Sequence, residues 1–86
     1  MRRPLVGVLY QPISATAYTV RYDGHDMGTV DRGRTHWWWD APGGGQGTHF
    51  RSRRAATLEL LSLSLPKAVL DLITGDRSQA SHGAEP

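Results

Sequence analysis

Apolar and polar residues alternate along the first half of the chain, which is the pattern of β-strands that bury one face of a sheet. Between positions 17 and 51, four such segments are separated by turns that contain Gly, Asp and Pro. The predicted strands are residues 17–22, 28–31, 35–41 and 47–51. The apolar run 5–10 also has the character of a strand, and its place in the sheet stays open. The pattern therefore predicts an antiparallel sheet of three to four strands.

One pairing register places turn-forming residues at the chain reversals and, at the same time, apolar residues on one face of the sheet. The predicted pairs are Val20 with Val30, Val30 with Trp37, and Trp37 with Phe50. The chain then reverses at residues 25, 33–34 and 43–44, where turn-forming residues stand. The residues placed beside this inner row are Tyr22, Gly28, Trp39 and Thr48. A slip of one residue would move the whole set to the other face, so the alternation specifies which face is inside.

Two helices are predicted after the sheet. Ser52 is a typical N-cap, and the first helix starts at Arg53. Pro66 ends that helix and begins a second, residues 66–74, with Gly75 at its C-terminal cap. The fold class is thus α+β, a sheet packed on one main helix and followed by a second short helix. We expect residues 1–75 to form one domain and the polar residues 76–86 to be a disordered tail.

The first helix carries two apolar stripes, although a helix that covers one sheet needs only one. The first stripe is Ala56, Leu60 and Leu63, and the second is Leu58, Leu61 and Leu65. The N-terminal segment, the second helix or a second copy of the chain could cover the second stripe. A homodimer through these three leucines is therefore one hypothesis.

The opposite face of the sheet is predicted to carry two rows of mostly polar residues. One row is Arg21, Thr29, Trp38 and His49, and the other is Thr19, Asp31, His36 and Arg51. Trp38 is unusual there, because exposed Trp often anchors a partner or stacks on unpaired bases. The alternative is a cation–π pair with Arg21. For the second row we favour mutual pairing of Asp31, His36 and Arg51 without a ligand.

The net charge of the chain is small, but half of its basic residues are concentrated in one segment. The formal net charge is +2, and nine of the ten basic residues are Arg. Five of them lie between positions 32 and 54: Arg32, Arg34, Arg51, Arg53 and Arg54. The last three gather where the sheet meets the helix, where the dipole disfavours cations. This placement indicates either an anion such as a phosphate near the helix start or solvated charges on an exposed turn.

No catalytic constellation is recognisable, and we expect a binding module rather than an enzyme, with no cofactor. The chain has no Cys, which excludes disulfides and thiolate zinc sites. His36 and His49 could approach across a hairpin, but two ligands rarely hold a metal. No apolar run reaches the roughly 20 residues of a membrane span. We expect a cytoplasmic protein.

Three features occur together in residues 18–61: the strand and turn at 18–24, the segment 39–41 before a Gly-rich tip, and the helix opening at 50–56. With these features, residues 18–61 resemble the AP2-like, arm-type DNA-binding domains of phage-type tyrosine integrases. The resemblance covers about half the chain and implies a three-stranded sheet in the major groove. It also implies base contacts by Arg21, Trp38 and Arg51, and phosphate contacts by Arg32, Arg34 and Arg53. Asp31 and Asp40 depart from it, because they would repel phosphates. No recombinase domain follows in this sequence, so the implied role is accessory.

Two functions remain in competition. The first, which we favour for the basic cluster at the helix start, is binding of double-stranded DNA through the exposed sheet face by a phage or plasmid accessory protein. The second is a protein-binding adaptor or an inhibitor of a host defence enzyme, similar in size to anti-CRISPR or anti-restriction proteins. The residues expected at either interface are Arg21, Arg32, Arg34, His36, Trp38, His49, Arg51, Arg53 and Arg54.

Overall fold

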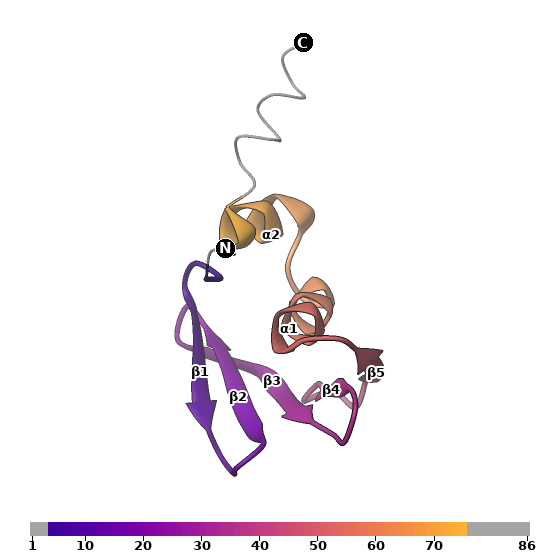
Figure 1. The fold of residues 1–86 in the computed structure, drawn as a ribbon. Helices are drawn as coiled ribbons and strands as arrows, with labels where there is room; N and C mark the ends of the chain where they lie inside the picture. Colours follow the sequence, from indigo (N-terminus) through magenta and orange to yellow (C-terminus); the bar gives the residue numbers. More distant parts are fainter. Residues whose placement is uncertain (1–3, 76–86) are drawn as a thin grey trace.

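Five strands lie side by side in the order in which they follow along the chain, each antiparallel to the next (Figure 1). They are β1 (Val8–Pro12), β2 (Ala17–Tyr22), β3 (His25–Arg32), β4 (Trp37–Asp40) and β5 (Gln46–Phe50). The structure is a computed structural model that describes residues 4–75. The predicted α+β class is confirmed. The sheet gains a strand because the N-terminal apolar run joins it as β1, along β2.

The predicted pairing is wrong by two residues over half the sheet. Val30 lies opposite Tyr18 and Trp39, not opposite Val20 and Trp37. The β2–β3 turn is tighter than expected, because Asp23 (φ 54°) and Gly24 (φ 78°) both take left-handed conformations. A shift of two residues preserves the alternation of faces, so the inner residues predicted for β2, β3 and β4 stay inside. Thr48 of β5, which was also expected inside, is exposed on the other face. The pair of Trp37 with Phe50 is confirmed.

A bulge in β5 changes the register at the far edge of the sheet. His49 has a φ of 73°, and the pairing of β4 with β5 shifts between Trp37 and Trp39. Trp39 consequently lies opposite Gly47 rather than Thr48. A Cβ atom at Gly47 would collide with the indole Nε1 of Trp39. The bulge therefore places a residue without a side chain opposite Trp39, which leaves room for the buried indole ring.

Helix α1 (Arg53–Ser62) packs across β3, β4 and β5. It begins as predicted at Ser52, whose Oγ accepts a hydrogen bond from the Ala55 N–H at 3.0 Å. A Cβ atom at Gly28 would lie 2.9 Å from a methyl group of Leu60, so the missing side chain lets the helix approach the sheet. The buried cluster beneath is Leu5, Val20, Val30, Trp39, Ala56, Leu60, Leu61 and Ile73. Leu63, expected in the inner stripe, is 55% exposed, because the helix ends just before it.

Helix α2 (Lys67–Thr74) and the N-terminal segment cover the second leucine stripe. Leu61 is fully buried in the same cluster as Leu5 and Ile73. Leu58 and Leu65 pack partly buried against that cluster. The Val6 N–H donates to the Ile73 carbonyl at 2.7 Å, which ties the chain before β1 to α2. Leu61 therefore offers a partner no surface, and a homodimer through the three leucines stays a prediction that the monomer structure does not test.

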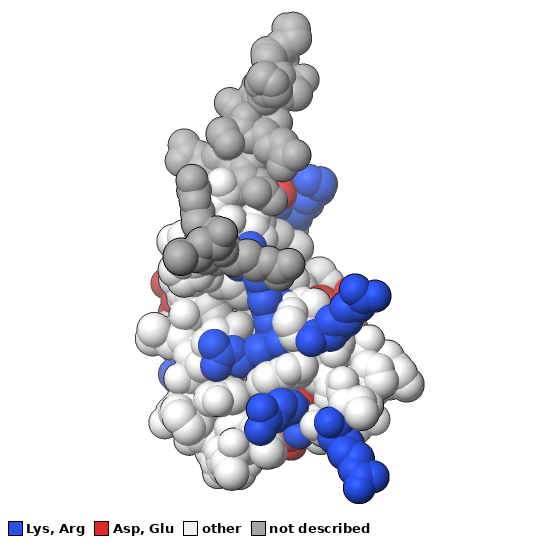
Figure 2. Space-filling model, in the orientation of Figure 1, with Lys and Arg blue, Asp and Glu red and all other residues white. Residues whose placement is uncertain are grey.

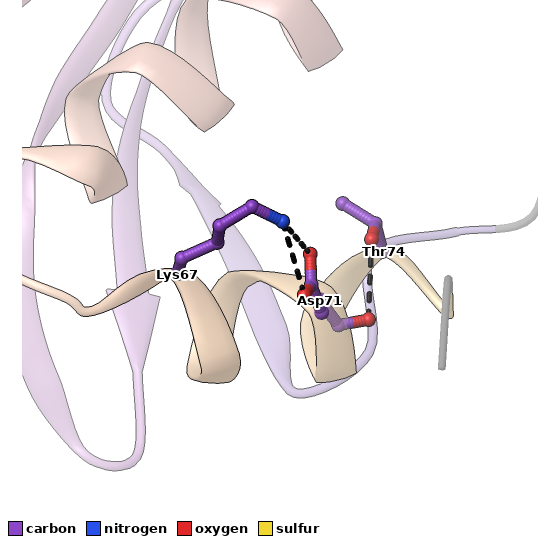
Figure 3. A network of polar contacts seen from close by, with 3 residues as sticks. All are labelled: Lys67, Asp71 and Thr74. Atoms are coloured by element: carbon purple, nitrogen blue, oxygen red, sulfur yellow. Dashed lines mark hydrogen bonds and ion pairs between the residues drawn. The ribbon is translucent and has the colours of Figure 1, made fainter. Parts of the chain in front are cut away.

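Polar contacts add little to α2. The Lys67 Nζ lies 3.3 Å from Asp71 Oδ2, and the Thr74 hydroxyl donates to the Asp71 carbonyl at 3.2 Å (Figure 3). The Lys67 side chain is 86% exposed, so solvent screens this ion pair. Gly75 ends the helix in a left-handed conformation, as predicted. The helix is held by packing, with Ile73 buried and Val69 and Leu70 against the cluster. Neither helix of the described part, 4–75, is long and apolar enough to cross a membrane.

Candidate functional site

Trp38 lies on the side of the sheet that the helices leave open, as the alternation predicts. Its neighbours in the strand, Trp37 and Trp39, pack on the helix side. The half-buried Trp38 lines an open hollow of about 460 Å³ together with Gln46, Gly47 and Thr48. We call this side of the sheet the outer face.

The predicted rows of the outer face are wrong in detail, because the register is shifted. Trp38 lies opposite Asp31, whereas Arg21 lies opposite Asp26 and Leu9. The Arg21 guanidinium donates instead to the Gly24 carbonyl at 2.9 Å. The cation–π pair of Arg21 with Trp38 is therefore not formed.

The pairing expected among Asp31, His36 and Arg51 is not formed either. Asp31 Oδ1 accepts a hydrogen bond from the Thr16 hydroxyl at 2.9 Å. His36 Nδ1 lies 2.8 Å from the Thr35 hydroxyl, and its ring centroid lies 4.9 Å from that of His49. The two His residues thus approach as predicted. Within residues 4–75 no group of three or more His, Cys, Asp or Glu could hold a metal ion.

On the helix side, Arg53 lies over two tyrosine rings. Its Cζ atom is 4.1 Å from the ring centroid of Tyr10 and 5.0 Å from that of Tyr18. The Thr57 hydroxyl donates to the Arg53 carbonyl at 2.7 Å, so the Tyr10 hydroxyl is the donor in its 2.8 Å bond to Thr57. The first turn of α1 is therefore fixed to β1 and β2 by stacking and hydrogen bonding together.

A hollow opens beside this stack. Tyr18 and Trp37 are close to parallel, with an interplanar angle of 25° and ring centroids 6.4 Å apart. Arg32, on β3, extends to the same side of the sheet. The hollow measures about 330 Å³ and is lined by Ala15, Thr16, Tyr18, Arg32, Trp37 and Arg53. Two guanidinium groups and two aromatic rings therefore share one recess.

A second hollow has Arg53 in common with the first. It measures about 470 Å³ and is lined by Pro4, Leu5, Val8, Tyr10, Ser52, Arg53 and Arg54. Figure 2 shows basic side chains spread around the start of α1, with small areas of acidic surface between them. We call the set Tyr10, Tyr18, Arg32, Trp37 and Arg53 the arginine–aromatic surface. Arg34 and Arg51 are exposed in the adjoining turns.

The structure divides the candidate site residues between the two sides of the sheet. Arg32 and Arg53 lie on the helix side, and Arg21 and Trp38 lie on the outer face together with Asp31 and Asp40. The sequence did not indicate Tyr10, Tyr18 or Trp37 as site residues, because inward aromatics normally belong to the core. The signal that could have found Tyr18 and Trp37 is their position near the ends of β2 and β4, whereas Tyr10 lies in the middle of β1.

Comparisons of the chain with protein-family models, with curated proteins and with solved structures found no match. The resemblance to integrase arm-type domains therefore stays a prediction. The division of its expected base-contacting and phosphate-contacting residues between two sides of the sheet does not favour it.

Proposed function

We propose that this protein is a non-catalytic module that binds nucleic acid through its arginine–aromatic surface. The observation that carries the proposal is the hollow in which Arg32 and Arg53 stand beside the rings of Tyr18 and Trp37. Guanidinium groups present a planar set of donors that suits phosphate oxygens. Aromatic rings add stacking on bases, worth about 1–3 kcal/mol per base.

The charges favour the helix side over the outer face as the binding surface. Asp31 and Asp40 point outward from β3 and β4, where they would repel phosphates. The start of α1 instead combines arginines with the positive end of the helix dipole. The proposed nucleic-acid contact therefore lies on the helix side of the sheet, and not on the exposed sheet face that the sequence suggested. Cytoplasmic location and an accessory role in a phage or plasmid remain part of the proposal.

The test is a fluorescence anisotropy titration of labelled oligonucleotides at low salt. We expect Arg32→Ala to weaken binding about fivefold or more and to reduce the slope of log affinity against log salt by about 1. Arg21→Ala, on the outer face, is the matched control and should leave both quantities nearly unchanged. Absence of binding at low salt, or equal losses in the two variants, would refute the proposal.

A second candidate function is capture of a protein partner at the outer face. The observation that favours it is the half-buried Trp38 beside a hollow of about 460 Å³, because large aromatics next to a recess often anchor interfaces. An adaptor or an inhibitor of a defence enzyme would use such a surface. Trp38→Ala should then abolish partner capture without lowering the melting temperature, and retained capture would exclude this surface.

A further inference from the structure

We propose that the ligand of the arginine–aromatic surface is a single strand of DNA or RNA, whose unpaired bases stack on Tyr18 and Trp37. This inference rests on the proposed function and specifies its substrate class. It differs from the duplex binding that the sequence suggested, and the difference follows from the shape, the spacing and the charge of the recess.

The shape of the site excludes bases that are held in a duplex. Duplex DNA is read by an element that protrudes into a groove, such as a helix or a two-stranded ribbon. Here the rings of Tyr18 and Trp37 line a recess with Ala15 and Thr16 of the β1–β2 turn at its rim. A base enters such a recess only when it is free of its pairing partner.

The spacing of the rings fits an extended strand. The centroid of Tyr18 lies 5.9 Å from that of Tyr10 and 6.4 Å from that of Trp37. These distances are almost twice the rise of about 3.4 Å per nucleotide in each strand of a duplex. Successive bases that contact successive rings would therefore be unstacked from one another. Arg53 lies over Tyr10 at 4.1 Å and, at 5.0 Å, over Tyr18 as well. Bases would therefore stack on Trp37 and share the Tyr18 ring with the Arg53 guanidinium.

The charges provide a path for the backbone of the strand. Arg32 and Arg53 both line the recess that holds the two rings. Arg53 also lines the second hollow with Arg54, next to Ser52 at the start of α1. A strand that crosses from one hollow to the other would keep its phosphates near guanidinium groups while its bases face the aromatic rings. Single-strand sites elsewhere combine the same two features.

The experiment compares four probes of equal length under one salt condition. They are an oligo-dT strand, the matching oligo-U strand, a DNA duplex, and an abasic strand that keeps the phosphates but has no bases. We expect dT or U to bind about tenfold more tightly than the duplex and the abasic strand. The relative affinity of dT and U then tells whether DNA or RNA is preferred.

Substitutions assign the effect to this recess. Trp37→Leu removes the stacking ring and should abolish the preference for dT over the abasic strand, whereas Trp37→Phe should retain it. Since Trp37 also packs on the core, a second variant leaves the core intact: Ala15→Glu places a carboxylate at the exposed rim. It should weaken dT binding about tenfold. Thr48→Glu makes the same change of charge on the outer face and should have little effect.

The outcomes separate the two proposals. Equal affinity for the single strand, the duplex and the abasic strand would overturn the single-strand inference while supporting nucleic-acid binding. No binding of any probe would overturn both. Loss of dT binding in Thr48→Glu but not in Ala15→Glu would place the contact on the outer face, and would also overturn the inference.

Discussion

The two sides of the sheet differ in what covers them and in the charge they present. The helix side is covered by α1 across β3, β4 and β5 and ends in arginines beside half-buried aromatic rings. The outer face is open, with Trp38 as its large aromatic and with Asp31 and Asp40 as carboxylates. Adjacent residues of one strand thus contribute to opposite surfaces: Asp31 to the outer face and Arg32 to the arginine–aromatic surface.

This difference teaches that charges next to each other in a sequence need not share a surface in the fold. In a strand, the parity of a residue decides its side, so Asp31 and Arg32 face opposite ways. The charge becomes interpretable once each arginine is assigned to a side.

The largest effect on this comparison is expected from a substitution that pushes α1 away from the sheet. Gly28 has a φ of 135°, and an added Cβ atom would lie 2.5 Å from the Asp40 carbonyl oxygen and 2.9 Å from Leu60. Gly28→Ala should therefore destabilise the fold by about 3 kcal/mol or more, which combines backbone strain with overpacking. Thermal denaturation followed by circular dichroism measures this. Gly43→Ala, with open space around the added atom, is the control.

A smaller effect on stability is expected when two neighbouring residues of β2 are substituted separately. Val20 is fully buried beneath the helices, whereas Thr19 is half-buried on the outer face. Val20→Ala should reduce the free energy of unfolding by about 2 kcal/mol, because it leaves a cavity in the core. Thr19→Ala should cost clearly less. Urea denaturation would decide, and equal losses in the two variants would contradict the assignment of the covered side.

The smallest expected effect concerns the helix start that carries Arg53. Ser52→Ala removes the acceptor of the Ala55 N–H and should cost about 1 kcal/mol. Ser52→Asp keeps an acceptor and should restore most of that stability, although its negative charge should weaken nucleic-acid binding. A melting curve and an anisotropy titration on the same samples separate the two effects. If Ser52→Asp bound as tightly as the parent protein, Ser52 would lie away from the path of the ligand.

The sequence predicted the side of the sheet on which a residue lies better than it predicted the residue's partner on the next strand. Alternation placed Val20, Val30 and Trp39 inside because a period of two survives any even shift of register. The pairing itself depended on two left-handed residues that are not glycine, Asp23 and His49. Asp23 stands in an Asp-Gly pair, which favours a two-residue turn, whereas nothing in the sequence singles out His49. Three of the four helix limits were predictable, because Ser52, Pro66 and Gly75 act locally, whereas α1 ends at Ser62, before the proline that was expected to end it.

Only the arginines of the candidate site could be predicted from the sequence. Arg32 and Arg53 were expected to contact phosphates, but their companions were not foreseen. Tyr10 reaches the site only because β1 pairs with β2, and the sequence left that pairing open. Whether Tyr18 and Trp37 lie under a helix or beside its first turn depends on the direction in which α1 crosses the sheet. No residue pattern within the helix specifies that direction.

The strands follow one another without crossing over, so each can pair as soon as its hairpin has been synthesised. The covering helices follow the sheet in the sequence, and the Tyr10–Thr57 bond joins residues 47 positions apart. We therefore expect a sheet that forms during synthesis to keep its apolar side uncovered until α1 and α2 emerge from the ribosome. Nascent chains cut short before α1 should aggregate, and expression of such fragments should yield insoluble protein.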